Sequence, residues 1–200
     1  HMLRHVLGDQ AFTDMLGAYR ATFAGGSAIT SDLQAVAESV YGGDLAWFFN
    51  EWVYGPGAPN YRYGWQCRQV GSEYQLLLDV EQYQTAYANF RMPIDITVTT
   101  NAGSQTHTIW QQDDIEWYLL PADGLVTGVQ FDKDTWVLSG DRANTSYKPP
   151  LQIVGTNPRI GGPGMNVTMI DIQFSQPVTY GDSDFTVTGI TLDPASPVQG

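Results

Sequence analysis

Apolar residues recur every three or four positions through the first part of the chain, which is the period of a helix with one buried face. Glycine or proline ends each of three successive stripes: Phe12, Met15, Leu16, Tyr19 and Phe23; Leu33, Val36, Ala37 and Val40; Leu45, Phe48, Phe49 and Trp52. Residues 1–7 are also helical in character. Short Gly-rich connections favour antiparallel neighbours, so the pattern predicts an antiparallel helical bundle fragment over residues 1–59.

From Tyr61 onward apolar and polar residues alternate, as they do in a half-buried strand. Strands are expected at 74–80, 94–99, 106–111, 115–119, 129–131 and 136–138. Short strands that turn signals separate are typical of an antiparallel, immunoglobulin-like β-sandwich, which we place at residues 60–140. Pro93 cannot donate to a ladder, so we expect it at a sheet edge or at the start of its strand.

A polar stretch that ends in two prolines is predicted to be a linker at residues 141–150. Beyond it, strand-like runs at 151–154, 167–174 and 185–192 predict a partial second immunoglobulin-like β module over residues 151–200. The expected fold class is therefore α+β in a two-part chain: a helical fragment first, then β modules.

Charge and cysteine content narrow the possible functions. Lys and Arg total 9 against 21 Asp and Glu, a formal net charge of -12, which repels nucleic acid and anionic membranes. No apolar run reaches the length of about 18 residues that a membrane span needs. Cys67 is the single cysteine, so we expect a packed strand residue and no internal disulfide. Few lysines, many polar residues and serial β modules suit a secreted or cell-envelope bacterial protein.

Two sets of residues could bind a metal. His1 and His5 are spaced i, i+4 and would share one helical face, but Met2 stands where a general-base Glu belongs and no motif places a third ligand. The acidic residues Asp113, Asp114, Asp182 and Asp184 could supply oxygen ligands for calcium. They lie at turns without the order of a calcium loop, so turn chemistry is favoured.

Other candidates are weaker still. Trp110, Trp117 and Trp136 could form a sugar-stacking platform, although aromatic residues are also common in half-buried strands. His107 has no visible triad partners, and Asn144 and Asn166 are glycosylation sequons in form only. Residues 161–164 lack the Lys and helix of a phosphate loop. We assign no catalytic, cofactor-binding or metal-binding residue in this chain.

Two segments carry a resemblance to a known family: Met2-Leu3-Arg4-His5-Val6-Leu7-Gly8-Asp9 and Ala46-Trp47-Phe48-Phe49-Asn50-Glu51-Trp52-Val53-Tyr54-Gly55-Pro56-Gly57-Ala58-Pro59. They resemble the part that follows the catalytic tyrosine in zinc aminopeptidases of the membrane alanyl aminopeptidase and leukotriene hydrolase type, the gluzincins. In that family an MLR-x-x-LGD helix leads to a W-F-F-x-x-W helix with a G-x-P exit and then a small β-sandwich. The run from Val129 to Leu138 is similar to the last strands of that sandwich. The match covers roughly residues 1 to 140.

The family binds zinc through H-E-x-x-H and a downstream Glu, and a Tyr stabilises the oxyanion; this sequence holds none of these parts. The resemblance therefore implies a non-catalytic C-terminal region of a secreted aminopeptidase-like metallopeptidase, with zinc in the parent protein and the rest of that chain as partner. We also expect Phe12, Phe48, Phe49 and Trp52 to form an exposed helical face that could dimerise. The alternatives are a carbohydrate- or protein-binding sandwich and a cryptic metal-dependent peptidase.

Overall fold

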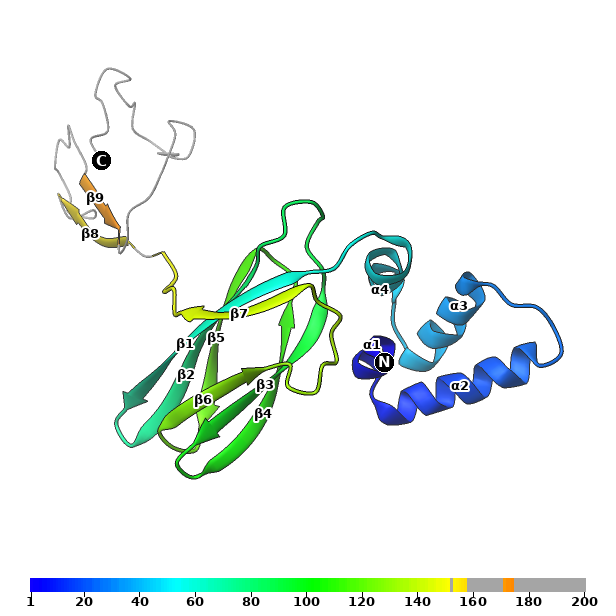
Figure 1. Cartoon of the computed structure of the whole chain (residues 1–200), viewed down its shortest axis with the longest axis horizontal. Helices are drawn as coiled ribbons and strands as arrows, with labels where there is room; N and C mark the ends of the chain where they lie inside the picture. Colours follow the sequence, from blue (N-terminus) through cyan, green and yellow to red (C-terminus); the bar gives the residue numbers. More distant parts are fainter. Residues whose placement is uncertain (152, 158–170, 175–200) are drawn as a thin grey trace, which may run out of the picture. The chain divides into compact units, whose positions relative to one another are not determined.

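The computed structural model describes residues 1–151, 153–157 and 171–174 (Figure 1). The chain divides into two compact units, His1–Pro149 and Pro150–Gly200. In the second unit, β8 (Ile153–Asn157) pairs with β9 (Asp171–Phe174) in an antiparallel ladder. The predicted strand at 185–192 lies outside the described residues. No helix in the described part is both long and apolar enough to cross a membrane.

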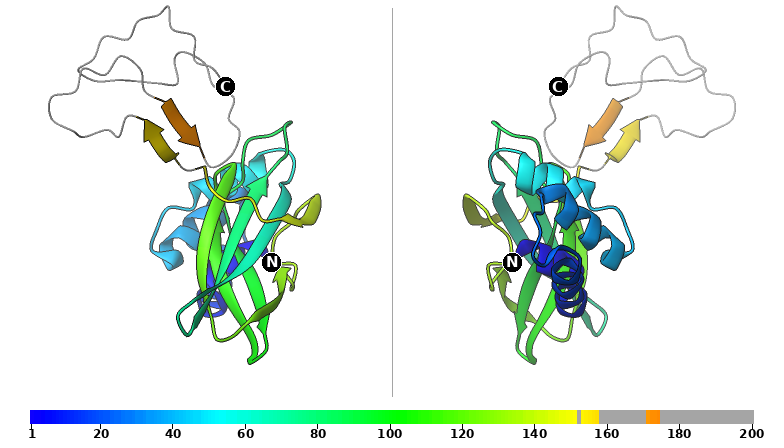
Figure 2. Two further views of the ribbon diagram at one scale, coloured as in Figure 1. Left: turned by 90° about the vertical axis from the view of Figure 1, so that its left-hand side faces the viewer. Right: turned by 90° about the vertical axis from the view of Figure 1, so that its right-hand side faces the viewer.

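The first unit begins with helices, as predicted. They are α1 (Met2–Leu7), α2 (Asp9–Phe23), α3 (Thr30–Tyr41) and α4 (Ala46–Phe49), which continues as the π-helical turn η1 (Asn50–Tyr54). Gly42, at φ 74°, ends α3 in the left-handed conformation that glycine adopts without strain. The helices lie at one end of the sheets (Figure 1), and the right-hand view of Figure 2 looks onto them with the sheets behind.

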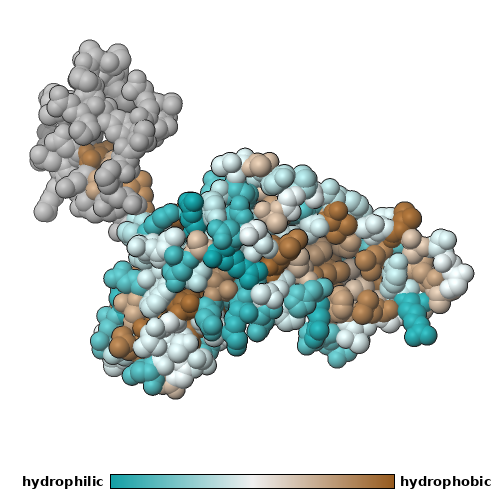
Figure 3. Space-filling view, in the orientation of Figure 1, coloured by the Kyte–Doolittle hydropathy of each residue, from teal (hydrophilic) through white to brown (hydrophobic). Residues whose placement is uncertain are grey.

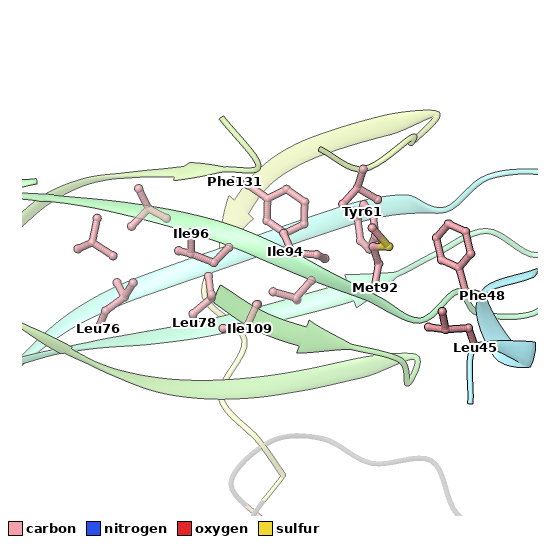
Figure 4. Close-up of a cluster of buried hydrophobic side chains, with 14 of the residues drawn as sticks. Leu45, Phe48, Tyr61, Leu76, Leu78, Met92, Ile94, Ile96, Ile109 and Phe131 are labelled. Carbon is pink, nitrogen blue, oxygen red and sulfur yellow. The ribbon is translucent and has the colours of Figure 1, made fainter. Parts of the chain in front are cut away.

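Two sheets follow the helices. Their strands are β1 (Asn60–Val70), β2 (Glu73–Gln82), β3 (Met92–Thr100), β4 (Gly103–Gln111), β5 (Ile115–Ala122), β6 (Val126–Phe131) and β7 (Asp141–Ser146). One sheet has the order β5-β2-β1-β7 and the other β4-β3-β6. The apolar faces of β1 to β6 enter one shared core, where Leu76 and Leu78 meet Ile94, Ile96 and Ile109 (Figure 4). Pro93 is the second residue of β3 and faces only Trp110 across the ladder, which confirms its expected place at the start of a strand.

One strand corrects the prediction of a wholly antiparallel sandwich. β7 runs parallel to β1, so the four-stranded sheet is mixed. The chain leaves β6 in the other sheet and arrives beside the beginning of β1, where the Gly140 N–H donates to the Pro59 carbonyl at 2.9 Å. Strand β7 also occupies residues 141–146 of the range expected to be a linker. Its sequence, DRANTS, has no apolar alternation, so the strand is stabilised by backbone pairing with β1 and not by burial of apolar side chains.

The strand predicted at 136–138 is wrong, because these residues belong to a loop. The buried Asp132 accepts hydrogen bonds from the backbone N–H groups of Trp136 at 2.8 Å and Val137 at 3.0 Å. An ion pair of 2.8 Å joins the same carboxylate to Arg142 at the start of β7. Asp132 therefore satisfies backbone donors that a strand would have given to a ladder, and it fixes the crossing between the sheets.

The predicted exposed helical face is also corrected in part. Phe48 and Phe49 are only 5% and 1% exposed, and they belong to the same hydrophobic cluster as the two sheets. Figure 4 shows Leu45 and Phe48 next to Met92 and Tyr61 at the end of this core. Phe48 and Phe49 therefore belong to the core and do not form an exposed face. The helical segment instead exposes Leu16, Ile29 and Val53, and apolar surface gathers over this segment in Figure 3.

Residues 146–149 cross the outer face of the four-stranded sheet, and we call this segment the strap. The backbone N–H of Lys148 donates to Asp79 on β2 at 2.7 Å, and the Lys148 ammonium meets Glu81 at 2.5 Å. The Lys148 carbonyl accepts the indole N–H of Trp117 on β5 at 2.7 Å. The strap therefore covers Asp79, which is buried although it lies on the outer face.

Asp79 should make stability depend on pH. Burial raises the pKa of its carboxyl above the ordinary Asp value, and Lys148 offsets this only in part. Asp79 thus contributes stability that is fully present below the unfolded pKa, about 4, and is lost as pH rises through the higher folded pKa. Denaturant unfolding measures the free energy of unfolding of the wild type and of Asp79→Asn. The wild-type value minus the Asp79→Asn value should decrease from acid to neutral pH. Asp123→Asn, at an exposed carboxylate, is the control. A difference for Asp79→Asn that is flat or rises with pH would contradict this.

Candidate functional site

The residues with the most unusual surroundings lie where the helices meet the sheets. Arg91 immediately precedes β3, and its backbone is held by η1. The Arg91 N–H donates to the Glu51 carboxylate at 2.6 Å, and its carbonyl accepts the Trp52 indole N–H at 3.1 Å. Both partners come from the π-helical turn, a geometry that is rare and often found at functional sites. Helix and strand thus fix the position of one arginine.

The side chain of Arg91 lies against two tryptophans. Its guanidinium carbon is 4.9 Å from the ring centre of Trp47 on α4 and 5.0 Å from that of Trp110 on β4. The two rings are 5.9 Å apart and nearly perpendicular, at 73°. Such cation–π contacts stabilise by about 0.5–1 kcal/mol each where water has access. We call Arg91, Trp47 and Trp110 the Arg91 cluster.

Part of this arginine has no protein partner. Its Nε is buried and donates no hydrogen bond to any residue that the structure describes. The two Nη nitrogens are not among the buried unpartnered atoms, and within the described ranges they too make no hydrogen bond. Glu51 accepts from the backbone N–H of Arg91 and not from its guanidinium, and burial raises the pKa of Glu51. The Arg91 cluster therefore presents a positioned cation whose outer nitrogens are available.

The predicted histidine pair is brought together, but around an aromatic ring. His1 and His5 stack on Trp136 with ring centres 4.3 and 4.9 Å away and interplanar angles of 11° and 10°. His5 Nε2 is 3.6 Å from Asp95 Oδ1. The described part of the chain contains no group of three or more His, Cys, Asp or Glu residues that could hold a metal ion.

The three predicted platform tryptophans serve different contacts. Trp110 and Trp117 are 39% and 40% exposed, whereas Trp136 is half-buried. Trp110 belongs to the Arg91 cluster, Trp117 donates to the strap, and Trp136 lies under the two histidines. Trp110 is therefore the one of the three that pairs substantial exposure with a contacting cation.

The predicted calcium residues that the structure describes make turn contacts. The Gln111 amide donates to the Asp113 carbonyl at 2.7 Å, and Asn89 donates to the Asp114 carboxylate at 2.6 Å. Both acids are exposed and lie between β4 and β5. Asp182, Asp184, Asn166 and residues 161–164 lie outside the described residues.

Three candidate residues and one pocket remain. Cys67 is half-buried on β1 against the core, and Asn144 is exposed on β7. His107 has a buried Nε2 without a hydrogen bond among the residues described. A pocket of ≈ 110 Å³ lies at the β3–β4 turn, lined by Thr100, Ala102, Gly103, Ser104, Gln105 and Asp123. Its single carboxylate gives it no evident chemistry.

The sequence did not single out Arg91 or Glu51. Arg91 follows a polar loop and precedes an apolar strand, so no periodicity marks it. The pairing of Trp47 with Trp110 depends on contacts between segments far apart in the chain. An arginine at the end of a polar loop, directly before an apolar strand, was the only available signal.

Comparison with known proteins finds similar chains among solved structures alone. No family model matches the sequence, and no curated protein matches it. Among solved structures, the chain is similar to part of Legionella pneumophila aminopeptidase A, solved in complex with aspartic acid, with a TM-score of 0.58 and 13% identity. The match covers 72% of this chain but 17% of that one, so the chain spans under a fifth of the aminopeptidase. At this identity the likeness shows the fold alone: helices followed by two sheets, as in one region of an aminopeptidase.

Proposed function

We propose that this chain is the non-catalytic C-terminal region of a secreted, bacterial, aminopeptidase-like metallopeptidase, in which it acts as a structural domain. The observation that carries the proposal is the shared core between helices and sheets. Phe48 and Phe49 lie in one hydrophobic cluster with Tyr61 and Met92, and the fold likeness to a region of an aminopeptidase supports the same assignment. We also propose that the two-sheet part is an immunoglobulin-like sandwich.

A shared core suits a buttress. Glu51 and Trp52 bind the backbone ahead of β3, so the last helical turn is hydrogen-bonded to the sheets as well as packed on them. A body attached to such helices is held at a fixed angle to the sheets. The exposed apolar residues of the helices, Leu16, Ile29 and Val53, offer contact surface for the remainder of the peptidase or for a second copy.

The proposal is tested by metal content and turnover. The purified chain should carry no stoichiometric zinc and should not hydrolyse aminoacyl-anilides, because it holds no H-E-x-x-H motif. A zinc aminopeptidase assayed in parallel shows that the substrates are sound. Stoichiometric zinc together with turnover, both lost in His5→Ala, would overturn the proposal in favour of a metal-dependent peptidase.

The coding sequence around this segment gives a second test. An H-E-x-x-H motif with a downstream Glu, encoded ahead of residue 1 in the same reading frame, is the expected finding. A reading frame without such a motif would overturn the assignment to a metallopeptidase.

A further inference from the structure

We infer that the Arg91 cluster is a binding site for a carboxylate group on a small ligand or chain end. This goes beyond the structural role proposed above and does not depend on it. The cluster is made by three segments, α4, the residue before β3, and β4, and each is held by its own secondary structure or core contacts. Its geometry is therefore set before any ligand arrives, which reduces the cost of binding.

The orientation of Arg91 follows from its neighbours. Glu51 and Trp52 fix its backbone, while Trp47 and Trp110 both contact its guanidinium. These two contacts restrict the rotamers of a long side chain that would otherwise move freely, so less side-chain entropy remains to be lost on binding. An arginine that served only as an ion-pair partner would direct its Nη groups to a protein carboxylate. Among the residues that the structure describes, those groups donate to none.

The chemistry favours a carboxylate. Two Nη–H groups lie in one plane and match the two oxygens of a carboxylate in a bidentate arrangement. The contacts of the described residues bring no second cation to the cluster, whereas tight binding of a dianionic phosphate usually needs several cations. The formal net charge of -12 adds a repulsion that grows with the charge of the ligand. Trp47 and Trp110 offer apolar surface beside the anion-binding group, which suits the organic part of the ligand.

Peptide chain ends and acidic sugars share this chemistry, and the experiment separates them. The whole chain is titrated with two carboxylates and their neutral analogues, and binding is measured by tryptophan fluorescence and calorimetry. The first pair is an acetylated dipeptide with a free carboxyl end and its C-terminal amide. The second pair is glucuronate and glucose. The expected result is saturable binding, in the millimolar range, of at least one carboxylate and of neither neutral analogue. Inorganic phosphate should bind more weakly. Tighter binding of phosphate, binding of the amide or glucose with equal affinity, or no binding at all would overturn the inference.

Matched variants locate the site. Arg91→Gln should weaken binding about tenfold or more, because hydrogen bonds to a charged donor are lost. Arg91→Lys keeps the charge but not the planar donors, so its affinity should lie between that of the wild type and that of Arg91→Gln. Arg20→Gln, at an exposed arginine on α2, is the control and should bind as the wild type does. Trp110→Leu keeps Arg91 and tests the flanking ring; it should weaken binding less than Arg91→Gln. Circular dichroism identifies any variant that fails to fold. Wild-type affinity in folded Arg91→Gln would overturn the inference. That outcome would leave the proposed structural role untouched, because zinc content and turnover test that role separately.

Discussion

Replacing Asp132 with alanine is expected to lower the free energy of unfolding by about 3–5 kcal/mol, the usual result of removing one partner of a buried ion pair. The substitution leaves Arg142 without its carboxylate and frees the N–H groups of Trp136 and Val137. Asp132 also has a positive φ of 44°, a conformation that Asp and Asn tolerate better than Ala does. Denaturant unfolding followed by circular dichroism measures the loss.

Two further variants separate these contributions. Asp132→Asn keeps an acceptor oxygen and the tolerance for positive φ but loses the charge, so its destabilisation should be smaller than that of Asp132→Ala. Asp134→Ala, two residues away at an exposed carboxylate, should change stability by less than about 0.5 kcal/mol. If Asp132→Ala were as stable as Asp134→Ala, the loop would not depend on this carboxylate.

Replacing Gly64 with alanine should displace the strap. A Cβ at Gly64 would lie 2.5 Å from the Ser146 carbonyl oxygen and 2.7 Å from Tyr147 Cα. Both are backbone atoms, so the strap rather than a flexible side chain must move. We expect a destabilisation of about 1–3 kcal/mol, with Gly64→Val at or above the upper end.

The strap also has an optical readout. Its displacement breaks the hydrogen bond from Trp117 to the Lys148 carbonyl and uncovers Asp79, so tryptophan emission should shift to longer wavelength. Gly128→Ala is the matched control, because a Cβ there meets only Thr99 Cβ at an ordinary 3.9 Å. An unshifted, fully stable Gly64→Ala protein would show that the strap does not rest on this strand.

The correct predictions share a physical basis in local periodicity. Stripes such as Phe12, Met15 and Tyr19 fixed the helical part, and alternation at Leu76, Leu78 and Val80 located strand β2. The predictions that failed concern residues whose conformation depends on distant groups. Trp136 has the apolar neighbours of a strand residue, yet its backbone N–H donates a hydrogen bond to the Asp132 carboxylate and not to a neighbouring strand.

The same reason explains why the Arg91 cluster was missed. Its members lie in a helix, a loop end and a strand, and none is unusual within its own segment. The histidine pair was found because the two residues are four positions apart at the start of α1, whereas the Trp136 ring that stacks on them lies far along the chain.

By itself, the sequence determined that helices precede strands, that no H-E-x-x-H motif is present and that the protein is acidic, because these follow from local spacing and composition. Only the tertiary structure decided that β7 pairs parallel to β1, that Phe48 and Phe49 are buried in one core with the sheets, and that Arg91 contacts two tryptophans. Each of these depends on contacts between residues far apart in the chain, where packing and backbone pairing outweigh local preference.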